Sequence, residues 1–202
     1  MRITGGKDSG RLLKAPKGLN VRPTPDLVKQ AIFNSLGARV AGSDVLELFA
    51  GTGALSLECL SRGARTVHCI EISPRHAQIL GQNSRQLGLV RGQCEVRVQD
   101  AFVALGHMLS TARAYDLILA DPPYGEKNVG HRSRSFAQRL LDDARVGQLL
   151  RPEGLFILGH TKRDTLAIPD AWQETKMLKH GDTIVRFFRK TAPPPMNSMN
   201  SG

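Results

Sequence analysis

The chain has 202 residues, with 28 Lys and Arg against 18 Asp and Glu, which gives a formal net charge of +10 at pH 7. This length allows one α/β domain with a sizeable core and short appendages. The excess of positive charge predicts attraction to polyanions, so the expected macromolecular partner is a nucleic acid. No leader pattern and no apolar stretch of the ~20 residues that cross a bilayer is present, so we expect a cytoplasmic protein without membrane association, which acts as a monomer.

The positive charge gathers in two segments that flank the motifs described below. Residues 1–22 hold six basic residues against a single Asp and show no sustained period, which predicts an extended arm or a short β ribbon. A second basic run follows Tyr124. Clustering of this kind favours contacts with phosphates over a general role in solubility. The candidate nucleic-acid contacts are Arg2, Lys7, Arg11, Lys14, Lys17, Arg22, Arg132 and Arg134.

Hydrophobic periodicity and turn residues predict helices and strands that alternate along the chain. Thr24 is expected to cap a first helix, with Pro25 and Asp26 in its first turn and an apolar stripe that begins at Leu27 and ends at Gly37. Further helices are expected at 54–61, 74–88, 102–109 and 136–150, strands at 45–49, 66–72, 94–98, 115–120 and 155–159, and a hairpin of strands at 172–178 and 183–189.

This alternation with short connections predicts a parallel, doubly wound sheet that ends in an antiparallel hairpin. The expected fold class is therefore α/β, with residues 23–190 as one domain behind the basic arm at 1–22. Residues 191–202 hold three consecutive prolines and no charge, so we expect this tail to be disordered.

A glycine-rich turn follows the first expected strand and opens a helix. Gly51 and Gly53 in this turn permit close approach of the backbone to a ligand. Glu71 ends the next strand, 20 residues after Gly51, where a carboxylate can accept both hydroxyls of a ribose. Glycines after strands also occur in ordinary turns, but in this combination they predict a nucleoside site.

An acid just before the turn separates the two cofactors that use such a site. Glu47 would repel the pyrophosphate of a dinucleotide, whereas it suits the α-ammonium group of a methionine moiety. S-adenosylmethionine is therefore the expected cofactor. Asp100 ends the third strand, where it can accept from the adenine amino group or cap the following helix. The candidate cofactor contacts are Glu47, Phe49, Ala50, Gly51, Gly53, Glu71, Ile72, Asp100 and Ala101.

The tetrapeptide Asp121-Pro122-Pro123-Tyr124 directly follows the fourth strand, at the same expected edge of the sheet. The exocyclic amine of a base is a poor nucleophile because its lone pair is delocalised into the ring. The Asp121 carboxylate and the Pro122 carbonyl can accept hydrogen bonds from one NH₂ group, while Tyr124 can stack on the base. These residues therefore predict methylation of a base amine, with Asp121, Pro122, Pro123 and Tyr124 as the catalytic residues. The six histidines and three cysteines show no ligand or catalytic spacing, so we expect no metal.

Several segments together are similar to one known family. They are residues 2–6 with Gly10-Arg11, Arg22-Pro23-Thr24 before a helix that contains Phe33-Asn34, residues 48–55, residues 61–64 and residues 121–124. Over roughly residues 1–190 the chain resembles the bacterial small-subunit (16S) rRNA guanine-N2 methyltransferases of the D type, which carry a short basic arm. The resemblance implies a seven-strand Rossmann-like methyltransferase fold and transfer of methyl to N2 of a guanine in 16S rRNA of an assembling small subunit. Ser56, Cys59, Leu27 and Lys29-Gln30 depart from the family pattern.

Three other functions fit parts of the sequence. An adenine-N6 methyltransferase of DNA would use the same tetrapeptide, but no helix-turn-helix or separate target-recognition domain is predicted. An NAD-linked oxidoreductase would use Gly51 and Glu71, but Glu47 and the lack of a residue for hydride chemistry disfavour it. A non-catalytic RNA-binding protein would differ from an enzyme in transferring no label from the cofactor.

Overall fold

The computed structural model describes residues 1–15, 24–124 and 132–191. Seven strands form one sheet in the order β3-β2-β1-β4-β5-β7-β6. Strands β1 to β5 are parallel to one another, and β7 is antiparallel to both β5 and β6. The strands are β1 (Asp44–Leu48), β2 (Thr66–Glu71), β3 (Cys94–Val98), β4 (Tyr115–Ala120), β5 (Leu150–Thr161), β6 (Trp172–His180) and β7 (Thr183–Lys190).

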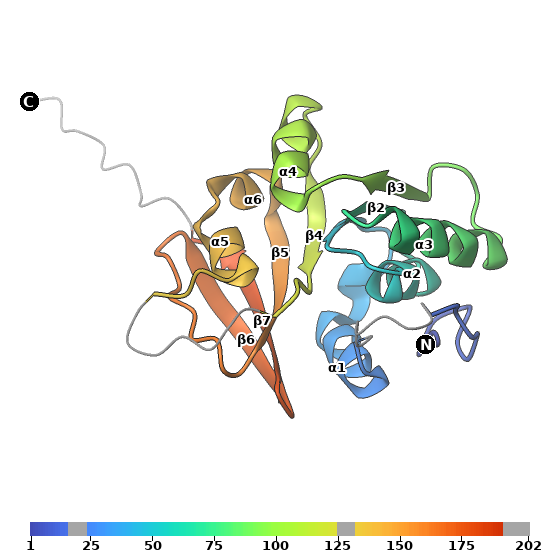
Figure 1. Ribbon diagram of the computed structural model, residues 1–202, viewed down its shortest axis with the longest axis horizontal. Helices are drawn as coiled ribbons and strands as arrows, with labels where there is room; N and C mark the ends of the chain where they lie inside the picture. Colours follow the sequence, from blue (N-terminus) through green and yellow to red (C-terminus); the bar gives the residue numbers. More distant parts are fainter. Residues whose placement is uncertain (16–23, 125–131, 192–202) are drawn as a thin grey trace, which may run out of the picture.

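Helices cover both faces of this sheet, as Figure 1 shows. The described helices are α1 (Asp26–Leu36), the 3-10 helix η1 (Gly37–Val40), α2 (Ala54–Ser61), α3 (Pro74–Gln86), α4 (Ala101–Ser110), α5 (Phe136–Asp142) and α6 (Ala144–Leu149). Helices α1, α2 and α3 share one apolar core with one face of the strands, and α4, α5 and α6 share a second core with the other face. The expected doubly wound seven-strand fold is thus confirmed. Within the described residues, every helix is too short or too polar to cross a membrane.

The two cores arise from the alternation of side chains along each strand. On β4, Leu117 and Leu119 point into the core with α1 to α3, and Ile118 and Ala120 point into the core with α4 to α6. Alternate residues of a strand therefore contact different sets of helices.

The prediction of one helix over residues 136–150 is wrong, because the structure has two helices there, α5 and α6, which meet at Asp143. The Asp143 backbone is extended, and its side chain accepts from the Arg145 N–H at 3.0 Å, which caps α6. The strand expected at 155–159 begins earlier, because Leu150 already pairs with Tyr115 and the register then shifts before Leu155. The local sequence could not reveal these strand pairings.

The first helix also differs from expectation at its start and along its buried face. Its N-cap residue is Pro25, and Thr24 makes no capping hydrogen bond, because the Thr24 hydroxyl donates to Asp121 instead. Leu27, expected in the apolar stripe, is 71% exposed. Lys29 is buried in its place, and its ammonium group bonds to the Arg2 carbonyl oxygen.

The basic arm is a short ribbon that packs on the domain over its described residues, 1–15. The Ile3 N–H donates to the Arg11 carbonyl at 2.9 Å, and the Ile3 carbonyl accepts from the Gly10 N–H at 3.0 Å. Ile3 and Leu13 are 0% and 5% exposed and belong to the core with α1 to α3. The ribbon is therefore anchored by burial of its own apolar side chains.

A buried acid ties the arm to α1 and α2. Glu58, fully buried on α2, accepts from the Thr4 backbone N–H at 2.8 Å and from the Thr4 hydroxyl at 2.9 Å. The same carboxylate pairs with Arg62 at 2.8 Å and lies 3.9 Å from the Lys29 ammonium nitrogen. Because a buried charge is costly without partners, this network fixes the arm, α1 and α2 relative to one another.

We predict that Ile3→Ala lowers the free energy of unfolding by about 2 to 5 kcal/mol, because it removes a fully buried side chain. The matched control is Leu12→Ala on the same ribbon, where the side chain is 71% exposed and the expected change is within about 0.5 kcal/mol. Urea unfolding followed by circular dichroism measures both. Equal stability of the two variants would show that the ribbon contributes nothing to the fold.

Candidate active site

The parallel strands bring the expected site residues to one edge of the sheet. The turn after β1, Glu71 at the end of β2, Asp100 after β3 and Asp121 after β4 all lie at carboxyl ends of neighbouring strands. Open α/β sheets bind ligands beyond this edge. The sequence therefore predicts the grouping correctly, and the contacts described below add what holds each residue in place.

The glycine-rich turn has the backbone geometry of a ligand cradle. Gly53, with φ +87°, precedes α2, and a Cβ there would lie 2.8 Å from Leu80 Cγ, so only glycine fits. A Cβ on Gly51 would meet nothing within 4 Å, which leaves open space beside the turn. Phe49 also has a positive φ of 59°, a conformation that costs about 1 to 3 kcal/mol and that collects at functional sites.

Glu71 holds the turn from the neighbouring strand. Its Oε2 accepts from the Gly51 backbone N–H at 2.7 Å, and its Oε1 accepts from the Ser73 N–H at 2.8 Å. His76 Nδ1 lies 3.5 Å from Oε1. A carboxylate has about four acceptor positions, so Glu71 retains capacity for further donors such as ribose hydroxyls. That contact with a ribose stays a prediction.

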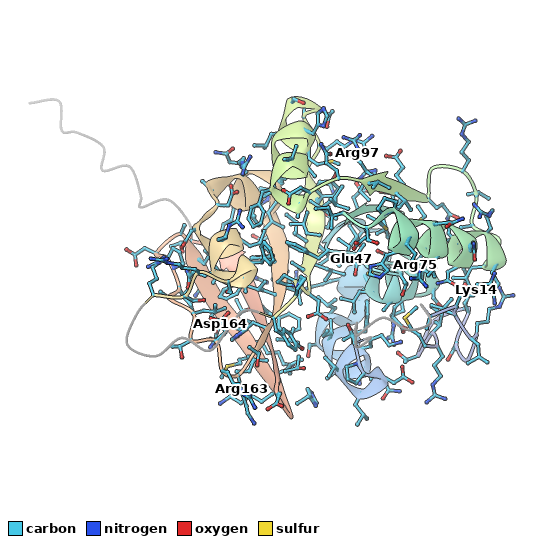
Figure 2. All side chains as sticks on the ribbon, viewed as in Figure 1. Lys14, Glu47, Arg75, Arg97, Arg163 and Asp164 are labelled. Carbon is cyan, nitrogen blue, oxygen red and sulfur yellow. The ribbon has the colours of Figure 1, made fainter. Side chains whose placement is uncertain are left out.

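Glu47 lies near the middle of the molecule in Figure 2 and is 3% exposed. It accepts from the Ser56 backbone N–H at 2.9 Å and from the Ser56 hydroxyl. Ser56, one of the departures from the family pattern, thus serves as the partner of this acid. Burial raises the pKa of Glu47 to about 8, although the bonds from Ser56 oppose the shift. The expected contact with a methionine ammonium stays a prediction.

Asp100 occupies the N-cap of α4. Its Oδ1 accepts from the backbone N–H groups of Phe102 and Val103 at 2.9 and 3.1 Å. The capping alternative raised by the sequence is therefore observed, and binding of adenine by the other oxygen stays a prediction. Ala101 is buried, while Ile72, at the end of β2, is 63% exposed and offers an apolar surface at this edge.

An aromatic cluster that the sequence did not predict lies beside the glycine-rich turn. The rings of Phe49 and Phe136 lie 5.5 Å apart, and those of Phe49 and Phe102 lie 6.3 Å apart. Arg139 stacks on Phe102 at 4.0 Å. These residues come from the turn after β1, from α4 and from α5, so only the folded chain joins them.

Asp121 points into a small pocket under α1. Thr24 and Val28 of the α1 segment line it, together with Gly159 of β5 and Thr183 of β7. The Thr24 hydroxyl lies 2.9 Å from Asp121 Oδ2. Burial raises the pKa of Asp121, and the hydrogen bond from Thr24 lowers it.

The rest of the tetrapeptide lies at the surface of the same edge. Pro122 is buried and Pro123 is exposed. Tyr124 is 53% exposed, and its hydroxyl lies 2.9 Å from the Thr183 hydroxyl at the start of β7. An aromatic ring that is exposed yet tethered in this way can act as a platform for a base.

Some cations of the arm lie near this edge, whereas Lys7 lies at the far end of α2, where its backbone N–H donates to the Ser61 carbonyl at 2.8 Å. Lys14 N–H donates to Asn83 Oδ1, and Asn83 Nδ2 donates to the Thr52 carbonyl of the glycine-rich turn, which joins the arm to the turn. Arg2 pairs with Asp26 at the start of α1, at 2.7 Å. The remaining candidates Lys7, Arg11, Arg132 and Arg134 are exposed, with Arg11 near Asp8 and Arg132 paired with Asp142, whereas Lys17 and Arg22 lie outside the described residues.

Comparison with known proteins agrees with the fold. The family model described as Conserved hypothetical protein 95 matches residues 1–189. The Ribosomal RNA small subunit methyltransferase D of Haemophilus influenzae is 28% identical over 189 residues, 94% of this chain and 93% of that protein. The solved structure of yhhF from Escherichia coli has 27% identity and a TM-score of 0.76, with 96% of this chain and 99% of that chain covered. A 16S rRNA N2 methyltransferase of T. thermophilus, solved with AdoMet and guanosine, has 26% identity and a TM-score of 0.66, with 87% of this chain and 45% of that chain covered.

The doubly wound sheet, with a glycine-rich turn after β1 and an Asp-Pro-Pro-Tyr segment after β4, defines the Rossmann-like class of S-adenosylmethionine-dependent methyltransferases. Within that class, the chain belongs to the family described as Conserved hypothetical protein 95. The resemblance to the D type of small-subunit rRNA methyltransferases is confirmed by its relatives.

We predict that Glu47→Gln flattens the pH dependence of the free energy of unfolding. Folding raises the pKa of Glu47 from its usual 4.5 to about 8, so the folded state binds one more proton between those values. Stability due to Glu47 is therefore present below pH 4.5 and is lost as pH rises towards 8, at up to about 1.4 kcal/mol per pH unit.

Urea unfolding at several pH values measures this difference. Glu153→Gln, at a side chain that is 83% exposed, is the control and should follow the wild-type pH dependence. Parallel curves for wild type and Glu47→Gln would contradict the assigned burial.

Proposed function

We propose that this protein transfers the methyl group of S-adenosylmethionine to the exocyclic N2 of a guanine in the 16S rRNA of the small ribosomal subunit. The observation that carries the proposal is the position of Asp121, which lies at the end of β4 beside the glycine-rich turn, with Tyr124 exposed next to it. The relatives named as small-subunit rRNA methyltransferases and the N2 methyltransferase solved with guanosine support the target.

The residues around the turn fit S-adenosylmethionine. Open space beside Gly51 leaves room for a ligand against the backbone, and Glu71 lies close enough to bond the Gly51 N–H. Nε2 of His76 is buried and has no partner among the described residues. Three acids, Glu71, Asp100 and Asp121, gather at this edge of a strongly basic protein, which suits a ligand with a sulfonium and an ammonium group. The bound cofactor would supply an electrophilic methyl group.

The protein's own contribution is to orient the amine. Asp121 in its ionised form accepts a hydrogen bond from the NH₂ group, and the Pro122 carbonyl accepts another. These two acceptors aim the nitrogen lone pair at the methyl carbon. With the cofactor bound, the nitrogen would gain the methyl group as the carbon–sulfur bond breaks, the bonding electrons would remain on sulfur, and one amine proton would be released to solvent.

Comparing rRNA nucleosides from cells with and without the gene tests the function most directly. Loss of one N2-methylguanosine from 16S rRNA in the deletion strain is the expected result. Loss of N6-methyladenine from DNA would instead identify an adenine methyltransferase, and an unchanged set of nucleosides would overturn the proposal.

We predict that Asp121→Ala lowers the single-turnover rate of methylation by about 10² to 10³ while cofactor affinity stays near wild type, because Asp121 acts mainly in the transition state. Tyr124→Ala should weaken RNA affinity more than it lowers the rate at saturation, because it removes a stacking platform. Rapid-quench assays on small subunits from the deletion strain give the rates, and calorimetry gives cofactor affinity. A wild-type rate for Asp121→Ala at saturation would refute its role.

We predict that Lys14→Gln and Arg134→Gln each flatten the salt dependence of RNA binding by about 0.7 to 0.9 log units, the value of one lost phosphate contact. Both side chains are exposed. Arg39→Gln, at an exposed side chain on η1 by the opposite edge of the sheet, is the control and should leave the slope unchanged. A wild-type slope in all three variants would indicate that RNA binds elsewhere.

A further inference from the structure

The carboxylate of Asp121 is held from two sides by residues that the sequence did not suggest. On one side, the Thr24 hydroxyl lies 2.9 Å from Oδ2. On the other, Gly159 lies so close that a Cβ built on it would be 2.5 Å from Oδ1 and 3.5 Å from the Asp121 Cα. Real Cβ atoms do not approach to 2.5 Å, so a side chain at position 159 would displace the carboxylate.

The alternation of side chains along β4 and the pairing of β4 with β5 explain this arrangement. Leu117 and Leu119 of β4 face the core under α1, so Asp121, two residues further on, continues on that face. Ala120 pairs with Leu158 of β5, which places Asp121 beside Gly159. The segment that enters α1 crosses the same face and brings Thr24 to the carboxylate.

The direction of the hydrogen bond follows from chemistry. An ionised carboxylate can only accept, so the Thr24 hydroxyl donates to Asp121. A donated hydrogen bond favours the charged form and opposes the effect of burial on the pKa of Asp121.

Few other groups near the pocket affect the charge of the Asp121 carboxylate. Glu47 on β1 is the titratable group that senses the Asp121 charge, and burial keeps Glu47 protonated to about pH 8. The other residues that line the pocket are uncharged: Val28, Ile32, Leu55, Ile157, Thr183 and Val185.

We propose that Thr24 and Gly159 are positioning residues, which hold the Asp121 carboxylate in one orientation and present it as an acceptor to the base amine. The Thr24 hydroxyl fixes one oxygen, and the absent side chain of Gly159 leaves room for the other. A protonated Asp121 would be a weaker acceptor for the NH₂ group, because one of its oxygens would then carry a proton. This inference rests on the role proposed above for Asp121, and the two are tested separately below.

The first test needs neither cofactor nor RNA. Carbon-13 NMR titration of the Asp121 carboxyl is carried out on wild type, Thr24→Val and Thr24→Ser. Valine matches threonine in shape and suits the extended backbone before Pro25, and serine keeps the hydroxyl. The pKa of Asp121 should rise in Thr24→Val and stay near wild type in Thr24→Ser. Equal pKa values in all three proteins would overturn the inference.

The second test measures the single-turnover rate against pH, with small subunits from the deletion strain as substrate. Thr24→Val should lower the rate about 10- to 100-fold at neutral pH and move its acid limb to higher pH, and Thr24→Ser should restore both. Gly159→Ala should lose a similar factor. Its control is Gly106→Ala on α4, where a Cβ would meet its nearest neighbour, the end of Arg145, at 3.5 Å.

The outcomes separate the two proposals. A wild-type rate in Asp121→Ala would refute the function of Asp121 but leave the NMR result as a test of the hydrogen bond. A slow Asp121→Ala together with wild-type rates and pH profiles in Thr24→Val and Gly159→Ala would overturn the positioning role alone. A slow Thr24→Val that serine does not rescue would also overturn it, because a hydroxyl would then not be the active feature.

Discussion

The site depends on one constraint, which is that five parallel strands end at the same edge of the sheet. Hydrogen bonding between neighbouring strands fixes their relative positions, so the turns after β1, β2, β3 and β4 must lie side by side. A parallel sheet needs helical crossovers, and these cover both faces and leave the edge open. The glycine-rich turn, Glu71, Asp100 and Asp121 are brought together by this geometry, although up to 74 residues separate Glu47 from Asp121 in the sequence.

The acids at this edge already accept hydrogen bonds from the protein backbone in the absence of a ligand. Glu71 accepts from the N–H of Gly51, Asp100 caps α4, and Glu47 accepts from Ser56. Each bond satisfies a donor at a turn or helix start that would otherwise be unpaired, so the site is shaped before a ligand arrives. Carboxylates keep spare acceptor positions after such bonds, which lets one residue both build the site and serve it.

Acidic and basic side chains lie in different places in this basic protein. The acids converge behind and around the glycine-rich turn, whereas exposed cations stand on the arm and on the segment before α5. The arm is fixed by the core through Ile3 and by Glu58 through Thr4, so its cations are carried on a folded ribbon. This division suits a small cationic ligand in the site and a polyanion across its rim.

The sequence by itself determined the sheet, the order of its elements and the residues of its carboxyl edge, because periodicity, caps and glycine turns are local signals. It did not determine what each side chain meets. Thr24 has the residue type of a helix cap, yet it bonds to Asp121, 97 residues away, and Leu27 is exposed while Lys29 is buried. The break at Asp143 and the early start of β5 likewise depend on strand pairing. Only the tertiary structure decided these points, because partners distant in the sequence compete with local preferences, and burial of a satisfied polar network outweighs propensity.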